Sequence, residues 1–194
     1  MGIQALDIRL FLLINHGTAN EFFDILMPLL SKRGYLLVLP FLAYLFYRGS
    51  KGKNPAGGSY LAAALWAFLI SVCTTLFAEF MEHVLKHAIG RPRPCDVIEG
   101  VRLLVPCPTS PSMPSGHAFS SFAFAAPLFY LTRKYIRIAA RIYPLALAAL
   151  IAYSRPYVGV HYPSDIAVGA LLGALIAMAF SVLYEHIRRE KTAA

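Results

Sequence analysis

The chain alternates between long apolar runs and short polar segments, a pattern typical of a protein that crosses a membrane several times. A helix needs about 20 apolar residues to cross roughly 30 Å of hydrocarbon. Five runs approach this length, although the third and fourth are short by this measure. The five predicted spans cover residues 30–47, 60–82, 117–132, 138–153 and 166–184. The sequence therefore predicts an all-α fold, a polytopic transmembrane helical bundle.

Two shorter apolar pieces precede the first predicted span, at residues 6–15 and 22–30. Each is too short to cross a bilayer alone, so the pattern favours helices that lie in the membrane interface. A sixth span is the alternative. We therefore expect one membrane-embedded domain over residues 1–194, with five to six spans and short interfacial helices at its N-terminus.

The composition agrees with a membrane environment, because 58% of the residues are hydrophobic and only 14% are charged. An ordinary soluble domain is about 25% charged. The net charge of +8 would suggest nucleic acid binding in a soluble protein. Here the basic residues lie between apolar runs, so we expect the bilayer, and no nucleic acid, as the partner. The oligomeric state stays open.

The distribution of basic residues predicts the orientation of the bundle. The loop after the first span, the loop after the third, Arg141 and the C-terminal tail together hold 10 of the 18 Lys and Arg residues. All of these positions fall on one side, and positive charge marks the cytoplasmic side. The polar segments 86–114 and 154–165 face the other side. We therefore expect the chemistry on the non-cytoplasmic, periplasmic or extracellular, face of the cell (inner) membrane.

Three cations in those two polar segments indicate an anion site. Lys86, Arg93 and Arg155 gather at one membrane face, and the planar fork of arginine suits bidentate contacts with phosphate. Ser115 and Gly116 directly precede an apolar run. Ser115 can cap the helix that begins there, and the free N–H groups of its first turn also attract an anion.

Two histidines and a carboxylate complete the candidate chemistry. His161 and Asp165 are four residues apart, so they share one face if a helix begins near His161. A carboxylate that holds one imidazole nitrogen leaves the other free to attack. His117, in the first turn of the third span, is placed to act as a general acid. The pattern predicts phosphoryl transfer through a histidine nucleophile.

These residues form three motifs: Lys-x6-Arg-Pro, Pro-Ser-Gly-His and Ser-Arg-x5-His-x3-Asp, in order between Lys86 and Asp165. This motif core, 86–165, resembles the type 2 phosphatidic acid phosphatase superfamily. The resemblance implies a lipid phosphatase that needs neither metal nor cofactor. It implies a phosphohistidine at His161, an orienting Asp165 and a proton donor at His117. The phosphate-binding residues that it implies are Lys86, Arg93, Ser115, Gly116 and Arg155.

The lipid itself is not specified by the motifs. Undecaprenyl pyrophosphate, phosphatidylglycerophosphate, phosphatidic acid and the 1-phosphate of lipid A all remain candidates, so monoester and pyrophosphate are both open. One alternative is a vanadate-dependent haloperoxidase, whose anion site is similar, but those enzymes are soluble and five apolar spans argue against it. The other is a non-catalytic lipid-binding or transport protein. Binding alone needs only cations, so His117, His161 and Asp165 argue against that alternative.

Several further residues carry weaker predictions. Arg91 either touches phosphate or anchors its loop. Glu79, Glu82 and His83 share a helical face with Lys86. A metal site is conceivable there, but the pattern favours carboxylates that pair with Lys86 or another cation. The two cysteines of the outward segment, 95 and 107, could form a disulfide in an oxidising compartment, and two free loop thiols are the alternative.

Overall fold

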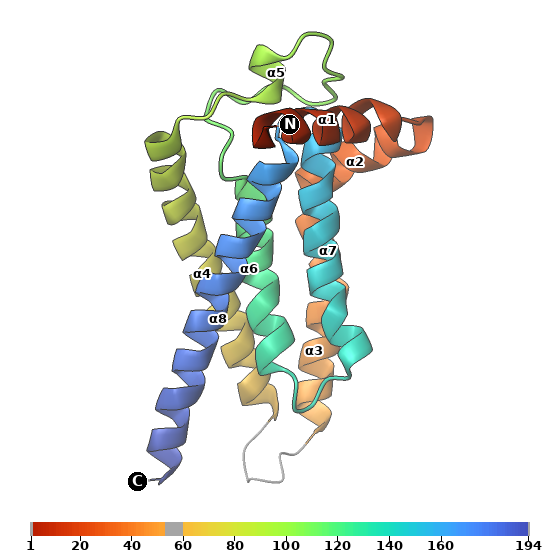
Figure 1. The fold of residues 1–194 in the computed structure, drawn as a ribbon. Helices are drawn as coiled ribbons and strands as arrows, with labels where there is room; N and C mark the ends of the chain where they lie inside the picture. Colours follow the sequence, from red (N-terminus) through yellow and green to blue (C-terminus); the bar gives the residue numbers. More distant parts are fainter. Residues whose placement is uncertain (1, 53–59, 194) are drawn as a thin grey trace.

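The computed structural model describes residues 2–52 and 60–193, and this part of the chain contains helices and loops but no strand. Residues 53–59 of the predicted basic loop lie outside it. The long helices run side by side in one bundle (Figure 1). The helices are α1 (Ile3–Leu12), α2 (Glu21–Arg33), α3 (Leu39–Lys51), α4 (Tyr60–Ile89), α5 (Pro94–Val97), α6 (Gly116–Leu131), α7 (Ile138–Tyr157) and α8 (Pro163–Ala193). A π-helical turn, η1 (Leu13–Gly17), follows α1, and a 3-10 segment, η2 (Gly34–Val38), follows α2.

Helix α6 is the centre of the bundle and packs against α4, α7 and α8. It approaches α8 closely because α8 presents glycines to it. A Cβ atom at Gly173 would lie 2.3 Å from the carbonyl oxygen of Phe119, and one at Gly169 would lie 2.6 Å from that of Ser115. Only residues without a side chain fit such contacts, so α8 holds the start of α6 in a fixed place.

The described residues contain four helical segments that are long and apolar enough to cross a membrane, at 21–51, 60–97, 138–157 and 163–191. Large apolar side chains on their outer faces, such as Trp66, Phe80 and Leu175, are about half exposed or more. That surface suits lipid better than water. Helix α6, with 16 residues, is only about 24 Å long and lies among its neighbours. The predicted polytopic all-helical bundle is confirmed.

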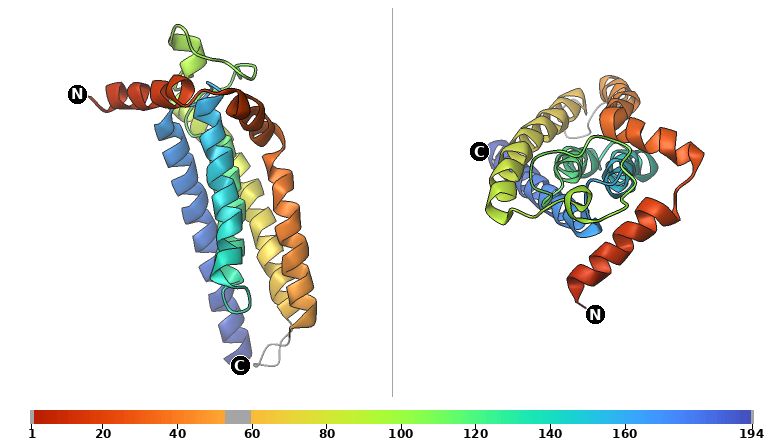
Figure 2. Two further views of the ribbon diagram at one scale, coloured as in Figure 1. Left: turned by 90° about the vertical axis from the view of Figure 1, so that its right-hand side faces the viewer. Right: turned by 90° about the horizontal axis from the view of Figure 1, so that it is seen from above.

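The first span begins earlier than the sequence predicted. Helix α2 begins after Asn20, whose side chain accepts a hydrogen bond from the Phe23 backbone N–H at 2.9 Å. It then continues through η2 into α3, so that residues 21–51 form one segment. The apolar piece 22–30 is therefore joined to the first span through η2, but α2 itself is steeply inclined to α3 and runs across the end of the bundle (Figure 2). The piece 6–15 does lie across the end of the bundle, as α1 and η1 (Figure 2).

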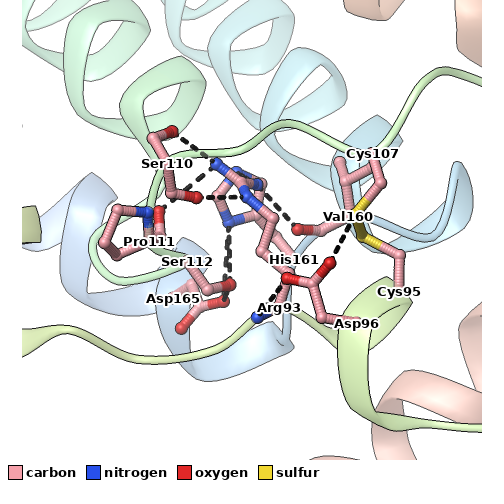
Figure 3. The surroundings of a disulfide bond; sticks show 10 residues. All are labelled: Arg93, Cys95, Asp96, Cys107, Ser110, Pro111, Ser112, Val160, His161 and Asp165. Carbon is pink, nitrogen blue, oxygen red and sulfur yellow. Dashed lines mark hydrogen bonds and ion pairs between the residues drawn. A yellow bond between two sulfur atoms is a disulfide. The ribbon is translucent and has the colours of Figure 1, made fainter.

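The two ends of the bundle differ in chemistry. The segments 90–115 and 158–162 meet at the end where α1 lies, whereas residues 132–137 and the C-terminus lie at the opposite end (Figure 1). The predicted division into a chemistry-bearing end and a basic end is therefore present in the fold. The sequence left open whether Cys95 and Cys107 are bonded, and the structure joins them in a disulfide in the loop next to the site (Figure 3).

Candidate active site

His161 lies in the short connection between α7 and α8, where its two ring nitrogens have different partners (Figure 3). Nε2 is 3.0 Å from Nη1 of Arg93, and Nδ1 is 3.5 Å from Oδ2 of Asp165. A guanidinium can only donate, so Nε2 accepts and the ring proton is on Nδ1, on the side of the carboxylate. This is the tautomer in which Nε2 keeps a lone pair for nucleophilic attack.

Burial keeps the His161 ring neutral. The residue is only 2% exposed, and removal from water lowers its pKa from 6.5 to about 3. The positive charges of Arg93 and Arg155 lower this pKa further, while the hydrogen bond with Asp165 opposes the change. An imidazole that is neutral at physiological pH is available as a nucleophile.

Asp165, in the first turn of α8, is completely buried and is held by several donors. Its Oδ1 accepts a hydrogen bond from Nη1 of Arg91 at 2.7 Å. Its Oδ2 accepts one from the Tyr162 backbone N–H at 2.8 Å and one from the Ser112 hydroxyl. These contacts stabilise the charged carboxylate and fix the direction in which it faces His161.

Arg93 is a buried cation held mainly by carbonyl oxygens. It is 2% exposed. Its Nε donates to the Ser110 carbonyl at 2.7 Å and its Nη1 to the Val160 carbonyl at 2.9 Å, while Nη2 lies 3.1 Å from the Ser110 hydroxyl. Among the described residues, no carboxylate forms an ion pair with it. A buried positive charge held in this way favours an anionic ligand.

The start of α6 supplies the second part of the anion site. Ser115 occupies the N-cap position, but its side chain makes no capping hydrogen bond. Its hydroxyl is buried and has no protein partner, because the backbone of Ser115 is instead tied to α8 through the Asp165 carbonyl, 3.1 Å from its N–H. The hydroxyl and the first-turn N–H groups are thus left for a ligand.

Gly116 and Lys86 meet at the carboxylate of Glu82. A Cβ atom at Gly116 would lie 2.4 Å from Oε1 of Glu82, so a larger residue there would require the Glu82 side chain to move. The same oxygen is 2.7 Å from Nζ of Lys86. The predicted pairing of a carboxylate with Lys86 is confirmed for Glu82, but no such partner is found for Glu79 in the described part of the chain.

Arg155 and His117 approach the site from the α2 side. Nη1 of Arg155 donates to the Ser31 hydroxyl, while its buried Nε has no protein partner. Nε2 of His117 lies 3.0 Å from the Ser31 carbonyl oxygen, which can only accept, so this nitrogen carries a proton. Ser31, near the C-terminal end of α2, therefore contacts two candidate residues that are 38 positions apart in the sequence.

A cavity of about 800 Å³ connects these groups with the interior of the bundle. The predicted site residues that line it are Lys86, Arg93, Gly116, His117, Arg155 and His161. Asp165 and Ser115 are not in the lining. Asp165 contacts His161, and Ser115 directly precedes Gly116. Away from the charged residues, one wall of the cavity is apolar and includes Leu30, Leu147 and Ile151. The cavity thus combines a cationic end, which suits an anion, with an apolar wall, which suits an apolar chain.

Several residues that hold the site were not predicted from the sequence. Ser110 and Ser112 contact Arg93 and Asp165, but they belong to a proline-rich loop without a recognisable motif. Asp7 contacts Arg91, and the only signal for it was an acidic residue in an apolar piece. Arg91 does anchor its loop, which favours the second of the two roles considered for it.

The fold and the cavity define a polytopic helical membrane protein with a histidine-containing anion site. The sequence model of the PAP2 superfamily matches residues 61–189, and the chain belongs to this superfamily. The match covers all three motifs and ends in the last helix.

Individual relatives agree with this assignment. The chain is 37% identical over 106 residues to an undecaprenyl-diphosphatase of Sulfolobus acidocaldarius. The matched stretch covers 55% of this chain and 50% of that protein. It therefore spans about half the length of that curated relative. The crystal structure of LpxE from Aquifex aeolicus is 28% identical, with a TM-score of 0.62, and covers 93% of this chain and 98% of LpxE. A transmembrane PAP2-type phosphatidylglycerolphosphate phosphatase from Bacillus subtilis, 21% identical, has the same fold, with a TM-score of 0.70 and coverage of 95% and 87%.

Proposed function

We propose that this protein is an integral membrane phosphatase that hydrolyses a phosphomonoester or pyrophosphate of an envelope lipid through a phosphohistidine at His161. The observation that carries the proposal is the position of the His161 Nε2 atom. It lies beside a buried, carbonyl-held Arg93 at the head of a cavity whose opposite wall is apolar. A phosphate bound among the cations would lie next to this nitrogen, while its tail stays in the bundle or the bilayer.

In the first step, Nε2 of His161 attacks phosphorus in line with the leaving oxygen. The nitrogen–phosphorus bond forms and the phosphorus–oxygen bond of the lipid breaks. Arg93, Lys86 and Arg155 stabilise the charge on the equatorial oxygens, as do the N–H groups at the start of α6. His117, protonated beside the bound phosphate, gives its proton to the leaving oxygen.

In the second step, water attacks the phosphohistidine. His117, now neutral, takes a proton from the attacking water, and the nitrogen–phosphorus bond breaks. Inorganic phosphate leaves, and both histidines return to their starting protonation states. Asp165 stabilises the positive charge that the His161 ring carries while it is phosphorylated. No step requires a metal or a cofactor.

The substrate class follows from the cavity and is supported by the relatives. A cavity with cationic residues at one end and an apolar wall suits a phosphorylated lipid better than a soluble phosphate ester. The relative in Sulfolobus acidocaldarius is named an undecaprenyl-diphosphatase. Undecaprenyl pyrophosphate, phosphatidylglycerophosphate, phosphatidic acid and the 1-phosphate of lipid A form the test panel.

The location and domain organisation belong to the same proposal. The site lies at the end of the bundle opposite the basic loop 132–137 and the tail, and by the positive-inside rule this supports a location on the non-cytoplasmic face of the cell (inner) membrane. Residues 1–194 act as a single membrane-embedded domain with the motif core 86–165.

The test is phosphate release from the lipid panel in detergent micelles with EDTA present, by the wild type, His161→Ala and His16→Ala. His16 is exposed, away from the cavity lining, and serves as the matched control. We expect release by the wild type and the control and none by His161→Ala. No release by the wild type from any lipid would favour the binding or transport alternative. Release that survives in His161→Ala would overturn the assignment of the nucleophile.

A further inference from the structure

The helix that lies across the end of the bundle reaches the candidate active site through one buried carboxylate. Asp7 of α1 is only 6% exposed. Its Oδ2 is 2.6 Å from Nη2 of Arg91, and its Oδ1 accepts a hydrogen bond from the Ser164 backbone N–H at 2.9 Å. The Ser164 hydroxyl also donates to Asp7. Asp7 therefore binds both the loop after α4 and the first turn of α8, where N–H groups lack helical partners.

Arg91 connects Asp7 to Asp165. Its Nη1 donates to Oδ1 of Asp165 and to the Ser164 hydroxyl, both at 2.7 Å. Its guanidinium also lies over the Tyr162 ring, 4.1 Å from the ring centroid. One planar cation thus bridges two buried carboxylates from opposite ends of the sequence, a task for which the arginine fork is suited and a lysine is not.

The bridge determines how Asp165 faces His161. Because Arg91 binds Oδ1, the other oxygen, Oδ2, is the one directed toward Nδ1 of His161, 3.5 Å away. Loss of the Asp7 charge would leave Arg91 with a single carboxylate and free its guanidinium to shift. The orientation of Asp165, and with it the proton position on His161, would then be less well defined.

We propose that Asp7 and Arg91 are positioning residues for the reaction, and that α1 is therefore part of the catalytic apparatus as well as a membrane-surface helix. This inference rests on the proposed function, since it assumes that Asp165 orients His161. Neither residue touches the lining of the cavity, so both act through Asp165. The turnover rate should respond to them, and substrate binding should not.

The test compares Asp7→Asn and Arg91→Lys with Arg9→Gln, which removes an exposed charge from the same helix. Steady-state kinetics are measured on the best lipid of the panel, and histidine ¹⁵N shifts report the tautomer of His161 in micelles. We expect kcat to fall by about 10- to 100-fold in both positioning variants, the range for partners that orient a functional histidine. KM should change little, and the Nδ1–H tautomer should lose its dominance.

The outcomes separate positioning from simple anchoring. If α1 is only an anchor, Asp7→Asn will lower thermal stability but keep kcat and the His161 tautomer of the wild type, and the inference is overturned. Asp7→Glu, which restores the charge, should recover part of kcat if positioning is correct. A wild type without phosphatase activity would instead overturn the proposed function, so the two failures are distinguishable.

A second, independent observation concerns the polar wall of the cavity. Glu79, Thr75, Ser120 and Ser121 from α4 and α6 line it opposite the apolar wall. Glu79 lies seven residues before Lys86 in α4, about 10 Å deeper along the helix axis. An ionisable side chain at membrane depth usually has a functional partner. The described residues provide no ion pair for Glu79, whereas Glu82 pairs with Lys86.

We infer that this polar wall is a subsite for the group that links phosphate to the tails, and that it selects a linker with hydrogen-bond donors, such as a glycerol or sugar with free hydroxyls. A carboxylate about 10 Å deeper than a phosphate ligand leaves room between the two for such a linker. A pyrophosphate attached directly to a polyprenyl chain has no hydroxyl that could donate a hydrogen bond to Glu79. The inference deepens the proposed function and depends on it.

Its test is the ratio of kcat/KM for phosphatidylglycerophosphate to that for undecaprenyl pyrophosphate. We expect the wild type to prefer the first, and Glu79→Leu to reduce this preference by about tenfold, as for one lost charged hydrogen bond. Glu99→Leu, which changes an exposed loop carboxylate, is the control. A wild type that prefers the polyprenyl substrate, or an unchanged ratio in Glu79→Leu, would overturn the subsite. Absence of activity on both lipids would overturn the proposed function itself.

Discussion

His161 is suited to nucleophilic attack because its two ring nitrogens lie in different surroundings. Nδ1 faces Asp165, while Nε2 faces Arg93 at the head of the cavity. Burial keeps the ring neutral, which leaves the Nε2 lone pair intact over the whole physiological pH range. In the proposed mechanism, the oxygens of a bound phosphate replace Nε2 as partners of Arg93 and release this nitrogen for attack.

The low pKa of His161 can be measured directly. Histidine ¹⁵N spectra in micelles, with His161→Asn used for assignment, should show this ring neutral at pH 5, where an ordinary histidine with a pKa of 6.5 would be about 97% protonated. The folded pKa, about 3, lies below the unfolded value. The neutral ring therefore costs no stability above pH 6.5, and stability falls as the pH decreases from 6.5 toward 3. A His161 signal that titrates near pH 6.5 would contradict this environment.

Gly116 gives a second prediction at the residue scale. A Cβ atom there would lie 2.4 Å from the Glu82 carboxylate, so Gly116→Ala should push Glu82 away and disturb its ion pair with Lys86. We expect kcat/KM to fall by about tenfold or more, since a misplaced phosphate ligand costs at least one charged hydrogen bond. A single variant as active as the wild type would show that the contact has no role.

The motif residues could be predicted from the sequence because their chemistry depends on residue type and local spacing. The i, i+4 relation of His161 and Asp165, and the position of Ser115 before a helix, are both local properties. Asp7, Ser31 and Ser112 could not be predicted, because they meet the site only after distant segments pack together. The hydroxyl of Ser115 could not be assigned either, since the choice between a cap and a ligand depends on the tertiary contact with α8.

At the scale of the elements, the site depends on how closely α8 approaches α6. The spans themselves were predicted from apolar runs, but apolar runs carry no information on the distance between two helices. The connection of α2 to α3 through η2 could not be predicted either. A Cβ at Gly173 would meet the Phe119 carbonyl at 2.3 Å, so α8 cannot carry a larger residue there without moving away from α6.

Gly173→Val should therefore lower stability by about 1–3 kcal/mol, the range for overpacking a tight contact. It should also lower kcat, because the displaced α8 carries Asp165 in its first turn. Thermal unfolding in detergent and steady-state kinetics check both effects. Leu175→Ala, on the exposed apolar face of the same helix, is the control and should change neither much. Wild-type behaviour of Gly173→Val would show that the two helices are less tightly packed.

The disulfide is a second feature, at the scale of the elements, on which the site depends. It closes a loop between Cys95 and Cys107, next to Arg93 and close to Ser110, which binds the guanidinium of Arg93. By the chain-entropy model a loop of this length contributes about 3 kcal/mol. Reduction should therefore lower the unfolding temperature and the activity of the wild type. The variant Cys95→Ser with Cys107→Ser should start lower and not respond to reductant. Equal responses of both proteins would exclude a role for the bridge.

For the whole molecule, the proposed arrangement places a cationic, histidine-containing site at one end of a membrane bundle and most of the basic loop residues at the other. Helix α1 covers the site end and the cavity opens into the interior between the helices. A lipid headgroup could therefore enter at the level of the interface while its tail remains in an apolar environment. The same division of charge predicts the orientation of the bundle in the membrane.

The orientation can be tested with single cysteines in a background where Cys73, Cys95 and Cys107 are replaced by serine. Glu99→Cys lies in the loop at the site end, and Lys134→Cys lies in the loop at the basic end; both positions are exposed. In intact cells, a membrane-impermeant maleimide should label the first and not the second. Labelling with the reverse pattern would place the site on the cytoplasmic face and contradict the positive-inside prediction.

The central claim, a covalent phosphohistidine at His161, is tested most directly by rapid-quench trapping with a ³²P-labelled lipid phosphate. We predict that label enters the wild-type protein before inorganic phosphate appears, that the bond is labile in acid and stable in base, and that peptide mapping locates it at His161. His161→Ala should show neither label nor turnover. Turnover of the lipid without any labelled protein, or label on another residue, would contradict the account.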